Sequence, residues 1–404
     1  MDSAADIIRR HLNEDVHALA VQEHWYQPFD KQMMLRQIQS RQKAKSKLPS
    51  WYGNLDLLFP SPLSVEQCSS ELTAAYKASC IQGELLVDMT GGMGVDSCAF
   101  ASRFSKVMFI ERQPELAETA RHNFKLLGIE NIHVVCGDSV AEIDNFDAPD
   151  WVFLDPSRRK EGKKVFLLED CEPDVPQIIQ RLWRAGARNV LLKLSPLLDI
   201  KQLKRTLPGI HTLHIVSVHH EVKELLLEVS ASPVPDLQVI CVNLESQELP
   251  TIWQSDFMTP SVLVPVFSPD TAEAEISYLY EPHPTIMKAG LMDLYVSQFE
   301  MCKLHKNSHL YFSSQWYKTF FGRVFKVEKM FGMGKSELKN GLMGLTKANI
   351  TLRNFPMKEQ ELRKKLKLAD GGEVTLIATT LQPNKHVLIW CHAIHQRCEK
   401  DAVE

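Results

Sequence analysis

The middle of the chain alternates short apolar runs with longer amphipathic stretches. Apolar runs occur at 85–87, 107–110, 133–136, 151–154 and 190–194. Each run is too short for a buried helix, and residues with helical periodicity separate the runs. Strands that alternate with helices predict a parallel sheet with helices on both faces.

Two later apolar runs, at 213–218 and 223–229, have a different spacing. Only the short turn at His219, His220 and Glu221 separates them. A connection of this length cannot cross over a sheet, so the two strands must pair antiparallel. The fold class that we predict is therefore α/β, a doubly wound sheet that ends in an antiparallel hairpin.

The flanking regions have other patterns. Residues 1–80 lack strand alternation and are expected to be helical; Ser64 followed by Gln67 fits a capping box at a helix start. Beyond residue 233 the pattern becomes α+β, with a helix expected at 286–299. We expect module boundaries at a proline-containing linker, 230–235, and at a glycine-containing break, 332–334. The expected modules are 1–80, 81–232, 233–332 and 333–404.

Composition and charge refine this division. Hydrophobic residues make up 44% and charged residues 24%, which is typical of globular proteins. The net charge of −4 argues against a uniformly basic nucleic-acid-binding protein. Residues 303–367, however, hold 15 Lys or Arg and four acidic residues, with aromatic residues between them. Basic groups bind phosphate and exposed aromatic rings stack on bases, so we expect this segment to bind RNA, although many of its aromatics will be core.

The sequence also indicates where in the cell the protein is found and whether it binds a metal. The acidic start at 1–6 lacks an apolar signal segment, and no run of about 18 apolar residues could cross a membrane. Nine cysteines without a CxxC pair indicate reduced thiols, so a cytoplasmic protein without membrane contact is expected. Cys391, His392, His395 and Cys398 lie within eight residues and have no second pair elsewhere, so no metal is expected.

Acidic residues follow four of the predicted strands. They are Asp88, Glu111, Asp138 and Asp155. Ligands of doubly wound sheets bind at the carboxyl ends of the strands. The loop 88–96 contains glycines, which let backbone approach a ligand closely, although a tight turn is the alternative interpretation.

The charges favour one cofactor over another. Asp88 enters the loop where a dinucleotide would place a phosphate, and a carboxylate there would repel it. S-adenosylmethionine carries an ammonium and no phosphate, so it suits this site; a turn cap remains the alternative role for Asp88. Glu111 could accept hydrogen bonds from ribose hydroxyls, and Asp138 could accept one from an adenine amine. The candidate cofactor contacts are Asp88, Thr90, Gly91, Gly92, Gly94, Glu111, Arg112, Asp138 and Ser139.

Three stretches together carry a family resemblance. They are 66–77, 88–96 and 155–159. With them, the chain resembles class I S-adenosylmethionine-dependent methyltransferases of the bacterial THUMP-like-domain family, and its core is similar to trimethylguanosine-synthase-type RNA methyltransferases. The resemblance implies a Rossmann-like sheet, a ferredoxin-like module at 233–332 and a THUMP-like RNA-binding module at 333–404. It also implies that Thr73 and Lys77 contact cofactor and Tyr76 contacts substrate, with a packing role as the alternative for Tyr76.

The stretch Asp155-Pro156-Ser157-Arg158-Arg159 occupies the place of the methyl-accepting loop. Amine-methylating enzymes have Asp/Asn-Pro-Pro-aromatic there, whose oxygens accept the amine hydrogens. We expect catalytic roles for Asp155, Pro156, Ser157 and Arg158, with RNA contacts from Arg159 and Lys160. The second proline and the aromatic are absent, which leaves the acceptor atom open. Carbon-5 methylation of pyrimidines ranks low, because no cysteine neighbours this strand end.

The function expected from these residues is methyl transfer to ribosomal or transfer RNA, at an exocyclic base nitrogen such as guanine N2. Arg353, Lys364 and Lys365 of the basic segment are the further RNA-contact candidates. Two alternatives stay open. One is a small-molecule or protein methyltransferase, and the other is a non-catalytic RNA-binding scaffold.

Overall fold

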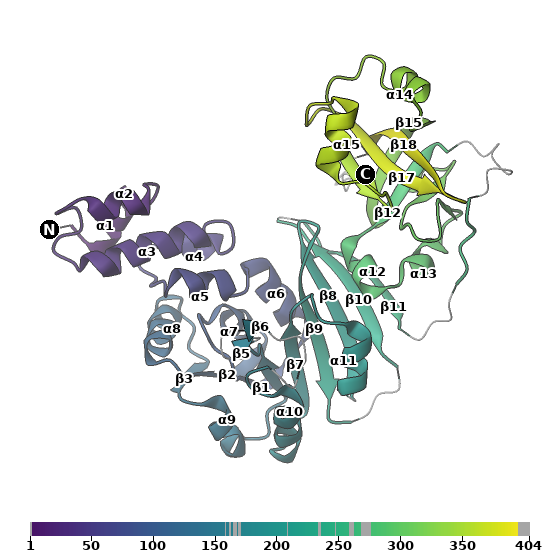
Figure 1. The fold of residues 1–404 in the computed structure, drawn as a ribbon. Helices are drawn as coiled ribbons and strands as arrows, with labels where there is room; N and C mark the ends of the chain where they lie inside the picture. The colour runs from purple at the N-terminus through teal and green to yellow at the C-terminus, as the bar shows by residue number, and fades with distance from the viewer. Residues whose placement is uncertain are drawn as a thin grey trace, which may run out of the picture. The chain divides into compact units, whose positions relative to one another are not determined.

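The protein divides into two compact units, residues 1–257 and residues 258–404 (Figure 1). The computed structural model describes residues 2–157, 159–160, 163–164, 168, 171–207, 209–232, 236–246, 248–257, 262–267 and 276–394. Each unit has its own sheet and core. No helix among these residues is long and apolar enough to span a bilayer.

Helices form the start of the first unit, as the sequence predicted. They are α1 (Ala4–His11), α2 (Val16–Val21), α3 (Lys31–Ala44), α4 (Pro49–Gly53), α5 (Pro62–Gln67) and α6 (Glu71–Cys80). The predicted capping box was wrong: Ser61 caps α5, and Gln67 is its last residue. Pro62 explains the shift, because proline favours the first helical position directly after the cap. Reciprocal capping pairs occur instead at the start of α1, between Ser3 and Asp6, and at the start of α6, between Ser70 and Thr73.

A nine-stranded sheet forms the core of the first unit. Its order is β11-β10-β8-β9-β7-β4-β1-β2-β3. The strands are β1 (Gly83–Asp88), β2 (Phe104–Glu111), β3 (Ile132–Cys136), β4 (Trp151–Leu154), β7 (Asn189–Leu194), β8 (Ile210–Val218), β9 (Glu221–Ser230), β10 (Gln238–Leu244) and β11 (Thr251–Asp256). Neighbours from β3 to β7 are parallel, and β9 is antiparallel to both β7 and β8. The doubly wound sheet with an antiparallel hairpin is confirmed.

Helices of the first unit follow the strands. They are α7 (Val95–Phe100), α8 (Pro114–Leu126), α9 (Ser139–Glu142), a 3₁₀ turn (Ile143–Asn145), α10 (Val175–Arg184) and α11 (Ile200–Thr206). Phe100 of α7 and Phe124 of α8 share one core cluster with Phe109 and Phe153 of the sheet. This packing fixes the loops at the carboxyl ends of the strands, where α7 and α8 begin.

The sheet continues past residue 232, where the sequence placed the end of the core. β10 pairs in parallel with β8, and β11 pairs antiparallel with β10. Most of β10 is buried, including Val239 and the continuous run from Cys241 to Leu244. The sequence did not predict strands here, because the prolines at 233 and 235 indicated the start of another module.

The second unit contains one seven-stranded sheet of order β13-β14-β12-β15-β18-β17-β16. Its strands are β12 (Tyr278–Pro282), β13 (Cys302–Lys303), β14 (Tyr311–Ser313), β15 (Gly322–Gly332), β16 (Asn349–Arg353), β17 (Val374–Leu381) and β18 (Lys385–Ile394). Its helices are α12 (Pro284–Ala289), α13 (Met292–Val296), α14 (Lys335–Gly341) and α15 (Glu359–Leu366). The long β15 pairs with both β12 and β18, so one sheet extends across the break expected at 332–334.

One predicted helix is divided in two. The sequence predicted a continuous helix over 286–299, but α12 ends before Gly290 and α13 follows. Gly290 has a φ of +74°, a left-handed conformation that glycine adopts readily and that closes the helix. Apolar periodicity continued through this position and concealed the stop.

Candidate active site

Parallel pairing brings three of the predicted acidic residues to one edge of the sheet. Asp88 is the last residue of β1 and lies opposite Phe109 of β2 on one side and Phe153 of β4 on the other. Glu111 ends β2, and Asp155 directly follows β4. The carboxylates therefore converge where a doubly wound sheet binds its ligand.

The loop at residues 88–96, which we call the glycine loop, lies directly against this edge of the sheet. A side chain at Gly91 would come within 2.5 Å of the Phe109 ring, and one at Gly94 within 2.6 Å of Phe124. At Gly92, where φ is +54°, the nearest atom to an added Cβ is a backbone oxygen 3.8 Å away. The loop is thus packed tightly on its inner side and open at Gly92. It has the room that close approach of a cofactor requires.

Asp88 is buried, and its carboxylate accepts two hydrogen bonds. Ser97 Oγ donates to Oδ2 at 2.5 Å and the Thr90 N–H donates to Oδ1 at 3.0 Å. Burial raises the pKa of Asp88 to about 7, and the nearby Asp96 and Asp155 carboxylates add to the rise. No cation pairs with Asp88 among the described residues. An ammonium group bound here would stabilise the ionised carboxylate, so the site fits S-adenosylmethionine.

The other predicted cofactor residues hold the loops around this edge. Glu111 accepts hydrogen bonds from the N–H groups of Gly92 and Gln113, each at 2.8 Å. Asp138 is exposed and caps α9, whose first residue is Ser139. Asp88 also caps the turn that follows it, which was the alternative role expected for this residue. Its Oδ1 accepts a hydrogen bond from the Thr90 N–H.

Thr90 joins the glycine loop to the loop that begins at Asp155, which we call the acceptor loop. Its Oγ1 accepts a hydrogen bond from the N–H of Asp155 at 2.8 Å, while its own N–H donates to Asp88. This link keeps the end of β4 beside the end of β1. A methyl donor on the first loop and an acceptor on the second would consequently meet at a fixed separation.

The acceptor loop folds back on itself after Asp155. Pro156 is buried, and the exposed Ser157 exchanges two backbone hydrogen bonds of 2.9 Å with Glu172. Arg112, which follows β2, pairs with the Glu172 carboxylate at 2.8 Å, and its pKa is raised by that contact. Arg112 therefore makes an exposed ion pair with the residue whose backbone pairs with Ser157, a contact that the sequence did not indicate.

Further along the chain, β5 (Arg159–Lys160) pairs antiparallel with β6 (Lys163–Lys164). Arg158, for which a catalytic role was predicted, lies outside the described residues. For Arg159 and Lys160 the backbone path is described and the side chains are not.

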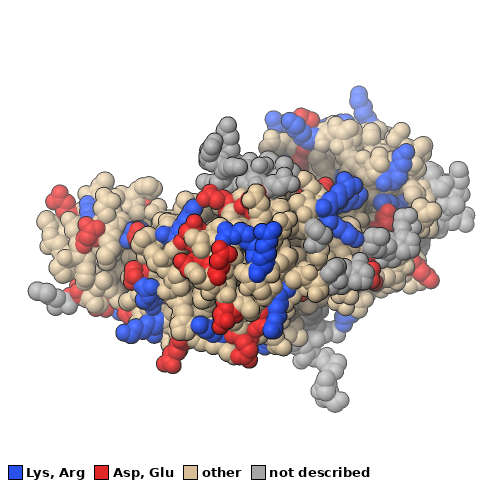
Figure 2. Space-filling model, turned by 90° about the horizontal axis from the view of Figure 1, so that it is seen from below, with Lys and Arg blue, Asp and Glu red and all other residues tan. Residues whose placement is uncertain are grey.

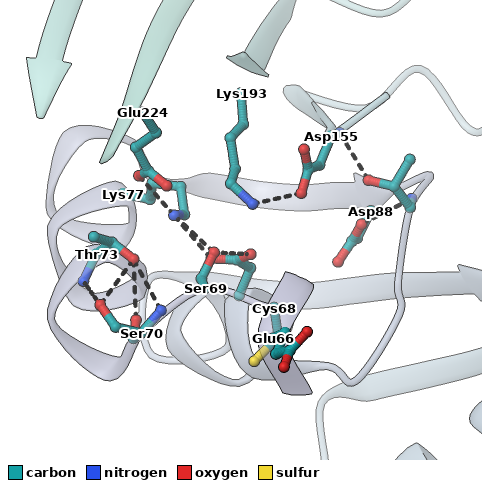
Figure 3. Close-up of polar contacts among 12 residues, drawn as sticks. Glu66, Cys68, Ser69, Ser70, Thr73, Lys77, Asp88, Asp155, Lys193 and Glu224 are labelled. Atoms are coloured by element: carbon teal, nitrogen blue, oxygen red, sulfur yellow. Dashed lines mark hydrogen bonds and ion pairs between the residues drawn. The ribbon is translucent and has the colours of Figure 1, made fainter. Parts of the chain in front are cut away.

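Buried charges from four elements meet beside Asp155 (Figure 3). We call them the lysine network. Its members are Lys77 of α6, Asp96 of α7, Asp155, Lys193 of β7 and Glu224 of β9.

Lys77 occupies one end of the network. It is fully buried, and its Nζ lies 2.9 Å from Glu224 Oε1 and 3.2 Å from Asp96 Oδ1. It also donates to Ser69 Oγ at 3.0 Å. The structure thus places the predicted contact Lys77 among protein carboxylates close to the acceptor loop.

Lys193 occupies the other end and was missed by the sequence analysis. Its Nζ donates to Asp155 Oδ2. Burial opposes the charged form, but Asp155, Asp96 and Glu224 outweigh it and raise the pKa of Lys193. A lysine between two leucines in an apolar strand was the available signal, because a buried cation requires anionic partners.

The two other residues of α6 singled out by the resemblance make contacts of a different kind. Thr73 belongs to the capping box that starts the helix. The Tyr76 hydroxyl lies 2.8 Å from His214 Nδ1, and His214 Nε2 lies 2.8 Å from Glu228. Tyr76 also belongs to the apolar core of the sheet. These contacts correspond to the packing alternative for Tyr76.

In the second unit, the predicted RNA contact Arg353 belongs to a cluster of three charges. Glu281 is buried and pairs with both Arg323 and Arg353. The two guanidinium groups, which we call the arginine pair, are 52% and 36% exposed. One carboxylate thus holds two cations and leaves a positive excess at the surface. Lys364 and Lys365 are exposed on α15.

The aromatic residues of the basic segment divide into two groups. Tyr311, Phe312, Phe320, Phe321 and Phe325 are buried, in keeping with the expectation that many would be core. Trp316 is 49% exposed, and Tyr317, Phe331 and Phe355 are half-buried. On the face shown in Figure 2, basic and acidic side chains are interspersed.

Comparison with known families supports both units. A model of RNA cap guanine-N2 methyltransferases matches residues 83–163. A ferredoxin-like domain matches residues 278–320, and a THUMP domain-like model matches 322–393. The first match covers the glycine loop, Glu111 and Asp155, and the last covers the arginine pair.

Comparison with individual proteins gives the same class. The crystal structure of a candidate methyltransferase from Porphyromonas gingivalis is 33% identical, with a TM-score of 0.84, over 97% of this chain and 98% of that one. An uncharacterized S-adenosylmethionine-dependent methyltransferase of Mycobacterium tuberculosis is 25% identical over 175 residues, 41% of this chain and 45% of that protein. A protein-L-isoaspartate O-methyltransferase of Methanococcus aeolicus is 29% identical over 109 residues, 26% of this chain and 44% of that protein.

The fold and the site together define a class I methyltransferase whose cofactor is S-adenosylmethionine. With a full-length relative at 33% identity, the chain belongs to the family of S-adenosylmethionine-dependent methyltransferases that carry a THUMP-like domain. The chain spans just under half the length of the curated relatives that it matches.

Proposed function

We propose that the protein methylates an exocyclic base nitrogen, such as guanine N2, of ribosomal or transfer RNA. The observation that carries this proposal is the position of Asp155. Its backbone N–H donates a hydrogen bond to Thr90 of the glycine loop. A carboxylate at this point can accept a hydrogen bond from an amine and direct its lone pair to the methyl group.

The chemistry requires orientation more than activation. Bound S-adenosylmethionine supplies a methyl group on a sulfonium: the acceptor nitrogen forms the new N–C bond, the C–S electron pair stays on sulfur, and the nitrogen releases one proton. Asp88 would hold the cofactor ammonium, and Glu111 would face its ribose. Asp155 would accept the amine N–H and stabilise the positive charge that develops on the nitrogen.

The second unit supports RNA as the acceptor. Its arginine pair exposes guanidinium groups whose planar shape suits phosphate. Residues 303–367 have a net charge of +11 and the remaining sequence −15, so basic charge is concentrated where the THUMP-like match lies. The guanine-N2 match of the first unit favours an amine of guanine over other acceptors.

Nucleoside mass spectrometry tests this function. Ribosomal and transfer RNA would be isolated from cells with and without the gene, digested to nucleosides and compared. We expect one methylated nucleoside to be absent without the gene and restored by the wild-type protein. Asp155→Ala should bind S-adenosylmethionine by calorimetry but fail to restore the nucleoside.

The alternative functions give different outcomes in the same experiment. An unchanged nucleoside profile would contradict RNA methylation. Methyl transfer from radiolabelled cofactor to protein or to small molecules would then support the first alternative. RNA binding without any methyl transfer would support a scaffold.

A further inference from the structure

The carboxylate of Asp155 is asymmetric. Lys193 Nζ donates to Oδ2, whereas Oδ1 accepts no hydrogen bond from the described residues. The Lys193 side chain is 13% exposed and that of Asp155 is 36% exposed. One oxygen is thus held from within the protein, while the carboxylate as a whole is still accessible to solvent.

The surroundings explain why a cation is needed at this point. Five charged groups lie near the Asp155–Lys193 pair: Asp88 of β1, Asp96 of α7, Glu224 of β9, Lys77 of α6 and Lys47, which follows α3. Four carboxylates therefore share this region with three lysines. Without Lys193, Asp155 would face like charges on its inner side and would turn toward solvent.

We propose that Lys193 is a positioning residue, which fixes Asp155 Oδ2 so that Oδ1 receives the methyl-accepting amine. This inference rests on the proposed amine methylation. In this role Lys193 would act through Asp155, its hydrogen-bond partner, and not by direct contact with the cofactor or the acceptor. The Glu224 and Asp96 carboxylates, which pair with Lys77, lie close enough to Lys193 to raise its pKa. The lysine network thus extends from α6, the helix before β1, to the acceptor loop after β4.

If Lys193 had only a structural role, its replacement would affect stability and not ligand preference. Loss of a buried ion-pair partner would lower stability but would leave the ligand preferences of the folded protein unchanged. The test therefore needs a ligand that places an amine where the transferred methyl lies. Sinefungin has this property, because an amine-bearing carbon replaces its methylated sulfonium. S-adenosylhomocysteine lacks both the methyl and the amine and serves as the reference ligand.

Calorimetry with the full-length protein measures both affinities. We expect the wild type to prefer sinefungin over S-adenosylhomocysteine, and Asp155→Asn to lose that preference. Lys193→Met should lose it by at least about fivefold, because an unanchored carboxylate no longer meets the amine. Lys193→Arg should retain most of the preference. Lys201→Met, an exposed lysine on α11, is the matched control.

The outcomes separate the two proposals. An unchanged or increased sinefungin preference in folded Lys193→Met would overturn the positioning role, whatever the RNA assay gives. If Lys193→Met is unstable, Lys193→Gln takes its place, and an unchanged sinefungin preference in that folded variant would likewise overturn the positioning role. A wild-type protein that prefers sinefungin but methylates no RNA would retain the role of Lys193 and contradict the choice of acceptor.

Discussion

The lysine network of the first unit and the arginine pair of the second, with the Glu281 that both arginines share, are opposites in charge and in exposure. Lys77 is one cation between two carboxylates, and all three side chains are at most 13% exposed. Glu281 is one buried anion between two cations, each at least 36% exposed. The first arrangement leaves a buried negative excess, and the second leaves a positive excess at the surface.

The difference indicates what each cluster can do. Charges in a low-dielectric interior interact strongly and need fixed partners, so they are suited to holding other groups in place. Charges at the surface interact weakly with each other and are available to a ligand, with a strength that salt reduces. The first cluster suits a cationic cofactor and a fixed acceptor carboxylate, and the second suits a phosphate chain.

The largest effect is expected for Lys77→Met. It leaves the Asp96 and Glu224 carboxylates buried with their shared cation removed, which should lower the free energy of unfolding by about 3–5 kcal/mol. Urea unfolding of the variant measures this loss. The exposed Lys125→Met provides the control. A loss below about 1 kcal/mol, the range of surface pairs, would remove the contrast between the two clusters.

Asp88→Asn should have the next largest effect, on cofactor binding. The amide keeps the shape of the side chain but cannot offer a negative charge to the cofactor ammonium. A lost hydrogen bond between charged groups costs about 2–3 kcal/mol, so calorimetry should show about 30- to 150-fold weaker binding of S-adenosylmethionine. Asp147→Asn, at an exposed position, should bind as the wild type does. Equal affinities would show that the buried negative charge is not the cofactor site.

The pH dependence of cofactor binding tests the same charge with a smaller effect. The pKa of Asp88 is raised to about 7, so its carboxylate is neutralised as the pH falls through that value. Affinity for S-adenosylmethionine should fall about eightfold between pH 7.5 and pH 6, in step with the ionised fraction. Asp88→Asn should lose this dependence.

The same group has the opposite effect on stability in the cofactor-free protein. Because the folded-state pKa of Asp88 lies above its ordinary value of 3.8, its contribution to stability is present below pH 4 and is lost as the pH rises toward 7. Comparing the pH dependence of unfolding of the wild type and Asp88→Asn isolates this contribution. A dependence of the opposite sign would contradict a buried, unpaired carboxylate.

The smallest effect is expected for Arg323→Gln in the second unit. Arg353 still pairs with Glu281 in this variant, so folding should be preserved. Binding of radiolabelled bulk transfer RNA should weaken by about threefold, and the slope of log affinity against log salt should decrease by about 0.7. Lys339→Gln on α14 controls for general loss of surface charge. An equal loss in both variants would show that the arginine pair has no special role.

Single residues and local sequence patterns predicted several parts of the fold and of the site. The runs from Leu85 to Leu194 predicted the parallel strands, and the short turn at His219 predicted the antiparallel hairpin. The acids that end consecutive strands predicted their own convergence, because parallel pairing places strand ends at one edge. In these cases local sequence suffices, since the side chain and its structural neighbour are fixed by strand register.

Other parts depended on contacts between distant positions. Tyr76 and Lys77 are adjacent in α6, yet the first meets His214 and the second meets Glu224. Arg353 meets Glu281, 72 positions away. No local pattern indicates such a pair, because each partner alone is compatible with a surface position.

The sequence by itself determined the α/β class, the glycine loop and the acids that line it, because strand periodicity and backbone sterics act over a few residues. Only the tertiary structure decided that Lys193 is bound to Asp155, that Arg112 pairs with Glu172 and that β10 and β11 extend the sheet. The physical reason is that the energy of a charge depends on its burial and its partners. Both are set by segments that fold together from distant parts of the chain.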